Sequence, residues 1–180
     1  MGVAGPVAFS VTWWWLGRRR IGYDPVQQPI SRLAATAQPT RMAMSAGMLA
    51  FSAGAAIYAR DVRKDEPRAS ALLAANAVGV AGIAALPLDA QYGDWPHMVA
   101  AAFSYATLSL LPAVSGDPVT GVMTGVFLVA SQIDGRHRGL WQRLGLSLGH
   151  SWIALKALGR NTSSVAPSGA AFFPLAKSTG

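Results

Sequence analysis

The 180-residue chain contains no cysteine and little charge. The absence of cysteine excludes disulfides, cysteine nucleophiles, thiolate zinc sites and cysteine-ligated iron–sulfur clusters. Charged residues make up 13% of the chain, whereas a typical soluble domain has about 25%. Together with a hydrophobic content of 52%, this deficit is typical of a protein whose surface faces lipid.

The few charged residues lie between six apolar stretches. The stretches without any Asp, Glu, Lys or Arg are 1–17, 42–59, 69–88, 95–116 and 118–133. A sixth, 139–159, contains only Arg143 and Lys156. A hydrocarbon core of about 30 Å needs roughly 20 helical residues, so each stretch has about the length of one crossing. The sequence therefore predicts an all-α fold, a polytopic transmembrane helical bundle of about six helices.

We place this six-helix transmembrane domain at residues 1–160 and expect a multi-pass protein of the cell membrane. Residues 161–180 are rich in Ser, Gly, Ala and Pro, a composition that predicts a disordered tail. Between the first two stretches, Ile30, Leu33, Ala34 and Ala37 follow helical spacing. This spacing predicts a short helix at the membrane interface.

The net charge of +7 would suggest a nucleic-acid partner in a soluble protein. Here the basic residues stand in short turns beside apolar stretches, where they serve orientation and contact with anionic lipid. No stretch resembles a module that reads RNA or DNA. The expected partners are membrane lipids and, as a further possibility, another protein, but no nucleic acid.

Six crossings would place alternate loops on the same side of the membrane. Loops 18–41, 89–94 and 134–138 then share one face, and the turns at 60–68 and 117 share the other face with both termini. The first face gathers the polar residues of interest: Asp24, Ser31, Asp89, Asp94, His97, Asp134, His137 and Arg143. From these we take Asp24, Ser31, Asp89, His97 and Arg143 as a candidate polar cluster.

Three sequence motifs occur in order along the chain. The first, Gly22-Tyr23-Asp24-Pro25 followed by Pro29-Ile30-Ser31-Arg32-Leu33-Ala34, resembles the first loop of the bacterial membrane-protein family known as domain of unknown function 998. Leu86-Pro87-Leu88-Asp89 with His97 is similar to that family's Pro-x-Asp and His elements, and Gly139-Leu140-Trp141-Gln142-Arg143 to its motif before the last helix. The resemblance spans residues 3–160 and implies a six-helix integral membrane protein without an established activity.

Asp89 and His97, with His137, supply carboxylate and imidazole groups that could bind a divalent metal, and Asp24 could join them. A metal site needs three or four such groups to converge. Alternatively, Asp89 and Asp94 order their loop, and His97 lies at the interface. Arg143 either reaches towards the headgroups or pairs with Asp89 or Asp24.

His150 lies inside the sixth stretch, where an ionisable residue is a functional candidate by default. It could also simply hydrogen-bond a neighbouring helix. We expect no haem between His97 and His150, because their positions along the two helices differ in depth by roughly 13 Å.

Three functions remain open, and the catalytic residues, if any, are unknown. We favour a helical bundle whose one-sided polar site binds a lipid or a protein partner. The first alternative is an intramembrane metal-dependent hydrolase acting on a lipid, in which Asp89 and His97 hold a metal that activates water. The second is a small transporter, which predicts an aqueous path that reaches His150.

Overall fold

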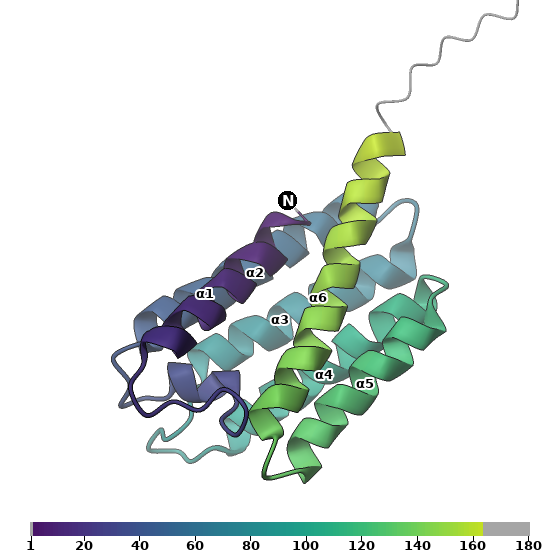
Figure 1. The fold of residues 1–180 in the computed structure, drawn as a ribbon. Helices are drawn as coiled ribbons and strands as arrows, with labels where there is room; N and C mark the ends of the chain where they lie inside the picture. Colours follow the sequence, from purple (N-terminus) through teal and green to yellow (C-terminus); the bar gives the residue numbers. More distant parts are fainter. Residues whose placement is uncertain (1, 164–180) are drawn as a thin grey trace, which may run out of the picture.

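The computed structural model describes residues 2–163, and every regular element in this part of the chain is helical. The elements are α1 (Ala4–Arg19), the 3-10 helix η1 (Ile30–Ala34), α2 (Arg41–Val62), α3 (Pro67–Ala85), α4 (Trp95–Val114), α5 (Pro118–Ile133) and α6 (Arg138–Ser163) (Figure 1). α6 extends to residue 163, three residues into the predicted tail. The rest of that tail lies outside the described residues.

Proline and aspartate determine where several helices begin. Pro67, Pro96 and Pro118 stand in the first turns of α3, α4 and α5, where the missing N–H would have had no partner. The Asp117 carboxylate caps α5 by accepting hydrogen bonds from the Thr120 N–H at 3.0 Å and the Thr120 hydroxyl at 2.7 Å. These residues fix the first turns of α3, α4 and α5, so each helix begins directly after a short turn.

The six α-helices of the described part form a closed ring in chain order. Each packs against its neighbours in the sequence, and α6 also contacts α1 (Figure 1). Phe51, Leu73 and Leu108 are among the side chains buried completely in the core. Glycine permits close helix contacts: a Cβ on Gly145 would lie 2.7 Å from Leu128 Cγ, so α5 and α6 can approach this closely only without a side chain there.

The outer surface of the bundle is apolar, as a lipid-facing surface requires. Val78, Leu110 and Val122 are more than half exposed, although their helices have buried faces as well. Among the described helices, α2, α3 and α4 are long and apolar enough to cross a membrane, and α5 is a shorter apolar helix. The chain is therefore a membrane protein built as a helical bundle.

The prediction that three loops share one end of the bundle is confirmed (Figure 1). Arg32 in the first loop forms an ion pair with Asp89 in the α3–α4 loop at 3.0 Å. The Leu140 N–H in the first turn of α6 donates to the Val26 carbonyl at 2.9 Å. We call this end the loop end.

The opposite end gathers the other two turns and the C-terminal part of α6, as predicted. Arg160 pairs with Asp65 and with Glu66 in the α2–α3 turn. The Trp152 indole N–H donates to the Asp117 carboxylate at 3.2 Å.

The short helix predicted in the first loop exists, but its apolar residues are buried in the protein. In η1, Ile30, Leu33 and Ala34 are at most 2% exposed, because they pack into the bundle instead of facing lipid. Ala37 lies beyond the end of η1 and is exposed. The first loop is therefore part of the core at the loop end.

Candidate functional site

A cleft begins at the loop end and runs into the bundle. It has two hollows, a mouth of about 100 Å³ and an inner chamber of about 30 Å³. Ser31, His97, Ala101, Tyr105 and Gln142 line both hollows, so the hollows meet at these residues. One water needs about 10–15 Å³ of such space. The inner chamber therefore has room for about two waters.

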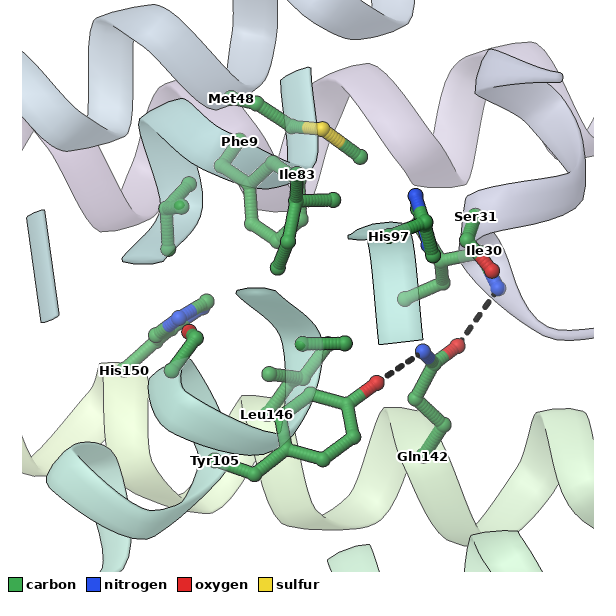
Figure 2. A pocket seen from close by; sticks show the side chains of 13 residues that line it. Phe9, Ile30, Ser31, Met48, Ile83, His97, Tyr105, Gln142, Leu146 and His150 are labelled. Atoms are coloured by element: carbon green, nitrogen blue, oxygen red, sulfur yellow. Dashed lines mark hydrogen bonds between the residues drawn. The ribbon is translucent and has the colours of Figure 1, made fainter. Parts of the chain in front are cut away.

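The two hollows differ in chemistry. Arg32, Asp94, Gln132 and Arg138 are among the residues of the mouth. The inner chamber is lined mainly by apolar side chains from α1, α2, α3, α6 and η1: Phe9, Ile30, Met48, Val80, Ile83 and Leu146. Two polar residues, Ser104 and His150, line the inner chamber but not the mouth, and Figure 2 shows His150 at the inner end. The cleft thus changes from polar at the loop end to apolar inside the bundle.

His97, in the first turn of α4, is held with one ring nitrogen towards the backbone. Its Nδ1 lies 2.8 Å from the carbonyl oxygen of Leu86, the residue that follows α3 and whose carbonyl no longer has a partner within the helix. A carbonyl only accepts, so Nδ1 carries the hydrogen and Nε2 has a free lone pair. His97 therefore contributes a hydrogen-bond acceptor to the cleft.

Gln142 of α6 connects η1 to Tyr105 of α4 (Figure 2). The Ile30 N–H donates to Gln142 Oε1 at 2.6 Å, which fixes the orientation of the amide group. Gln142 Nε2 then donates to the Tyr105 hydroxyl oxygen. The hydroxyl keeps its own hydrogen, for which the described residues provide no acceptor, so Tyr105 contributes a donor to the cleft.

His150 lies at the inner end of the cleft, twelve residues into α6 and so about 18 Å along its axis. The imidazole ring is 3% exposed and packs between Phe9 and Phe51, with ring centres 5.4 and 4.4 Å away. Its Nδ1 has no hydrogen-bond partner among the described residues. A buried polar atom without a hydrogen-bond partner lowers the stability of the fold. The His150 side chain that carries this atom lines the inner chamber.

Asp89 and Asp94 order the α3–α4 loop at the edge of the mouth. Asp94 accepts a hydrogen bond from the Asp89 N–H at 2.7 Å, and Asp89 pairs with Arg32. The backbone of Asp89 has a φ of 58°, a left-handed conformation that Asp adopts more readily than most residues. These contacts agree with the loop-ordering alternative for the two carboxylates.

Asp24 and Arg143 both stabilise the first loop, but not by pairing with each other. Asp24 closes a turn by accepting a hydrogen bond from the Val26 N–H at 2.8 Å. Arg143 donates to the carbonyl oxygens of Pro25 and of Gln28, the latter at 3.1 Å. Arg143 therefore fastens the first loop to α6 through backbone oxygens, and it pairs with neither Asp89 nor Asp24.

Tyr23 also takes part in the contact between Arg143 and the first loop. Its hydroxyl accepts a hydrogen bond from Arg143 and donates to the Pro29 carbonyl at 3.1 Å. Burial raises the pKa of the Tyr23 phenol, although the neighbouring Arg143 opposes the effect. The phenol is therefore protonated at neutral pH and able to donate.

The structure does not bring Asp89, His97 and His137 together around a common centre. Asp89 faces Arg32, and the Nδ1 of His137 lies 2.9 Å from Asp134. Within residues 2–163, no three His, Asp or Glu side chains are arranged to hold a metal ion. Of the candidate polar cluster, Ser31 and His97 line the cleft, Asp89 lies beside its mouth, and Asp24 and Arg143 fasten the loop above it.

Sequence reasoning missed Tyr105 as a site residue. Tyr105 follows His97 by eight residues, a little over two turns of the same helix, and it is a polar aromatic residue in a charge-free stretch. That spacing predicts that the two side chains lie on the same face of the helix, and it could have identified Tyr105. Gln142 belongs to the third sequence motif, but the sequence analysis predicted no function for it.

Residues 3–131 match the family described as Protein of unknown function (DUF998). The match covers more than two thirds of the chain, so the chain belongs to this family. It includes the first-loop motif and the segment from Leu86 to His97, whereas the motif at 139–143 lies beyond it. No curated protein and no solved structure matches the chain significantly.

Proposed function

We propose that the chain is a multi-pass protein of the cell membrane whose cleft binds the hydroxyl-bearing headgroup of an uncharged lipid. The observation that supports this function is the pair of free hydrogen-bonding groups in the cleft. His97 Nε2 needs a donor, and the Tyr105 hydroxyl needs an acceptor. A hydroxyl group provides both functions, and a glycerol headgroup has more than one hydroxyl.

The position of the cleft also suits a lipid. Its mouth lies at the loop end, where helices that cross a bilayer meet the headgroups, and its inner chamber is apolar. Buried donors and acceptors discriminate strongly, because a molecule that lacks the matching hydroxyl leaves them unpaired. The cleft should therefore prefer a hydroxylated lipid over one of similar shape without hydroxyls.

The test compares monoolein, which has two free hydroxyls, with methyl oleate, which has none. Binding to the detergent-purified protein is measured by native mass spectrometry for the natural sequence, Tyr105→Phe and the control Tyr92→Phe. Tyr92 is 54% exposed in the α3–α4 loop and does not line the cleft. One neutral hydrogen bond contributes about 1 kcal/mol, or about fivefold in affinity.

We expect monoolein to bind more tightly than methyl oleate, and Tyr105→Phe to reduce that preference about fivefold while Tyr92→Phe preserves it. Equal binding of the two lipids would refute the proposal. An equal loss for both lipids in Tyr105→Phe would assign this hydroxyl a structural role as the partner of Gln142.

The multi-pass arrangement has its own test, which the absence of cysteine makes simple. Single cysteines at Gln91, Arg136 and Lys64 would be labelled with a membrane-impermeant maleimide in sealed vesicles. Gln91 and Arg136 belong to the loop end and Lys64 to the opposite end, and all three are exposed. Labelling of Gln91→Cys and Arg136→Cys from one side and Lys64→Cys from the other is expected. Labelling of all three from one side would contradict the topology.

The depth of the cleft supports a second candidate function, a small transporter for hydroxylated solutes. The cleft extends from the loop end to His150, as an aqueous path would require. Light scattering of proteoliposomes after a glycerol gradient distinguishes the two functions. Faster swelling with the protein than without it would favour transport, whereas monoolein binding without glycerol flux would favour lipid binding.

A further inference from the structure

A second pocket lies at the end of α1, apart from the cleft. It has a volume of about 350 Å³, within the range of roughly 300–1,000 Å³ that ligand pockets occupy. Its lining combines arginine with aromatic residues, chiefly Arg18, Arg20, Arg143, Trp13, Trp14 and Tyr23. No residue of this lining belongs to the cleft.

The three arginines have no acidic partner among the described residues. Arg18 lies over the ring of Trp14 at 4.5 Å, and Arg20 donates a hydrogen bond to the Arg32 carbonyl at 3.1 Å. Arg143 points its charge at carbonyl oxygens, and its buried Nε has no partner. The pocket therefore concentrates three positive charges that no carboxylate in its lining balances.

One acidic residue, Asp24, is close in the sequence, but its carboxylate accepts the Val26 N–H and does not line the pocket. Tyr23 lies in the lining and stays protonated, because burial raises the pKa of its phenol. The charge of the pocket is therefore positive throughout the neutral range.

The surroundings of the pocket identify which anion reaches it. Trp14 is 50% exposed, and Ile21, between the arginines and Tyr23 in the sequence, is 100% exposed. Tryptophan is enriched where a membrane protein meets the headgroup region, and a fully exposed isoleucine is stable there among acyl chains. Arginine binds phosphate through several parallel hydrogen bonds. We propose that this pocket binds the phosphate of an anionic phospholipid.

The arginines of α1 offer a matched comparison. Arg18 and Arg20 line the pocket, whereas Arg19 lies over Trp15 at 4.2 Å and is not part of the lining. We assign each arginine of the lining the strength of one basic residue beside an anionic headgroup, which is about fivefold in affinity. Arg18→Gln with Arg20→Gln should therefore weaken phosphatidylglycerol binding about 25-fold, and Arg19→Gln should leave it unchanged.

The experiment titrates the full chain in detergent with phosphatidylglycerol and with phosphatidylcholine, and measures binding by native mass spectrometry. We expect one tightly bound phosphatidylglycerol, weaker binding of phosphatidylcholine, and no displacement by millimolar inorganic phosphate. Displacement by inorganic phosphate would overturn the assignment to a lipid. An equal loss in Arg19→Gln would show that overall charge, not the pocket, attracts the lipid.

A thermal melt of each variant checks that it is folded. Arg20 holds the first loop through the Arg32 carbonyl, so the double variant could be unstable for that reason. Arg18 makes no hydrogen bond among the described residues, and Arg18→Gln alone should still weaken phosphatidylglycerol binding about fivefold. Unchanged binding in this single variant would refute the proposal. Monoolein is uncharged, so a failure here leaves the test of the cleft unaffected.

Discussion

Gly139 is the point at which α6 meets the first loop, and Gly139→Ala tests whether that contact holds the loop end together. A Cβ at this position would lie 2.2 Å from the Gln28 carbonyl oxygen and 2.5 Å from the Pro25 carbonyl oxygen. Both neighbours are backbone atoms, so no side chain can rotate away. The loop would have to move by about 1 Å to restore an ordinary contact.

Such a movement weakens the hydrogen bonds that pass from α6 to the loop. These are the bond from the Leu140 N–H to Val26 and the bonds from Arg143 to Pro25 and Gln28. Overpacking costs about 1–3 kcal/mol, and a hydrogen bond from a charged donor contributes roughly 1.5–3 kcal/mol. Alanine is about 1 kcal/mol better than glycine within a helix, which offsets part of the loss. We expect a net destabilisation of about 2 kcal/mol.

The assay is unfolding of the detergent-purified protein by increasing sodium dodecyl sulfate, followed by tryptophan fluorescence. Gly125→Ala is the matched control, because a Cβ there would meet its nearest neighbour, Ser109 Oγ, at an ordinary 3.5 Å. Gly125→Ala should be neutral or stabilising by up to about 1 kcal/mol. Equal stability of the two variants would refute the claim that the loop is fastened at Gly139.

Two further predictions concern single side chains. His150→Leu should raise the free energy of unfolding by about 1 kcal/mol in the same assay, because it removes a buried nitrogen without a partner; a loss of stability would contradict this view of the imidazole. Asp134→Asn should reduce the acid sensitivity of folding. Hydrogen bonds from Trp141 and His137 hold the pKa of the Asp134 carboxyl below its usual range. The ionised Asp134 carboxylate therefore stabilises the fold fully above about pH 5, and this contribution is lost as the pH falls below that value. The free energies of unfolding at pH 7 and pH 3 should differ less in Asp134→Asn than in the natural sequence. An unchanged difference would show that Asp134 does not contribute to the acid sensitivity.

The arrangement of the helices was predictable because the exclusion of charge from lipid leaves a clear mark in the sequence. The stretch 118–133 coincides with α5, and the stretch 69–88 overshoots α3 by three residues, since Leu86 and Pro87 leave the helix. The gathering of loops at one end followed from the alternation of antiparallel helices. These features depend on local composition and on chain order.

The cleft was not predictable in the same way, because its key contacts join distant parts of the chain. Ile30 and Gln142 are 112 residues apart, and nothing near either residue indicates the other. The partners of Arg143 were unexpected for a related reason. A loop without regular structure leaves its carbonyl oxygens without backbone partners, and a half-buried arginine such as Arg143 can satisfy several of them at once. Charge patterns in a sequence identify carboxylate partners but not such carbonyls.

His150, at the inner end of the cleft, lowers the stability of the fold, so we ask what its imidazole could bind. An unpaired imidazole nitrogen between Phe9 and Phe51 costs roughly 1–3 kcal/mol, and leucine would fill the same space without that cost. Packing therefore gives no reason for histidine at position 150. The inner chamber beside it has room for about two waters, so a hydrogen-bonding molecule that entered from the loop end could reach the ring. Such a molecule would offset the cost of the imidazole, and for that reason His150→Leu should stabilise the empty protein while weakening whatever binds at this depth.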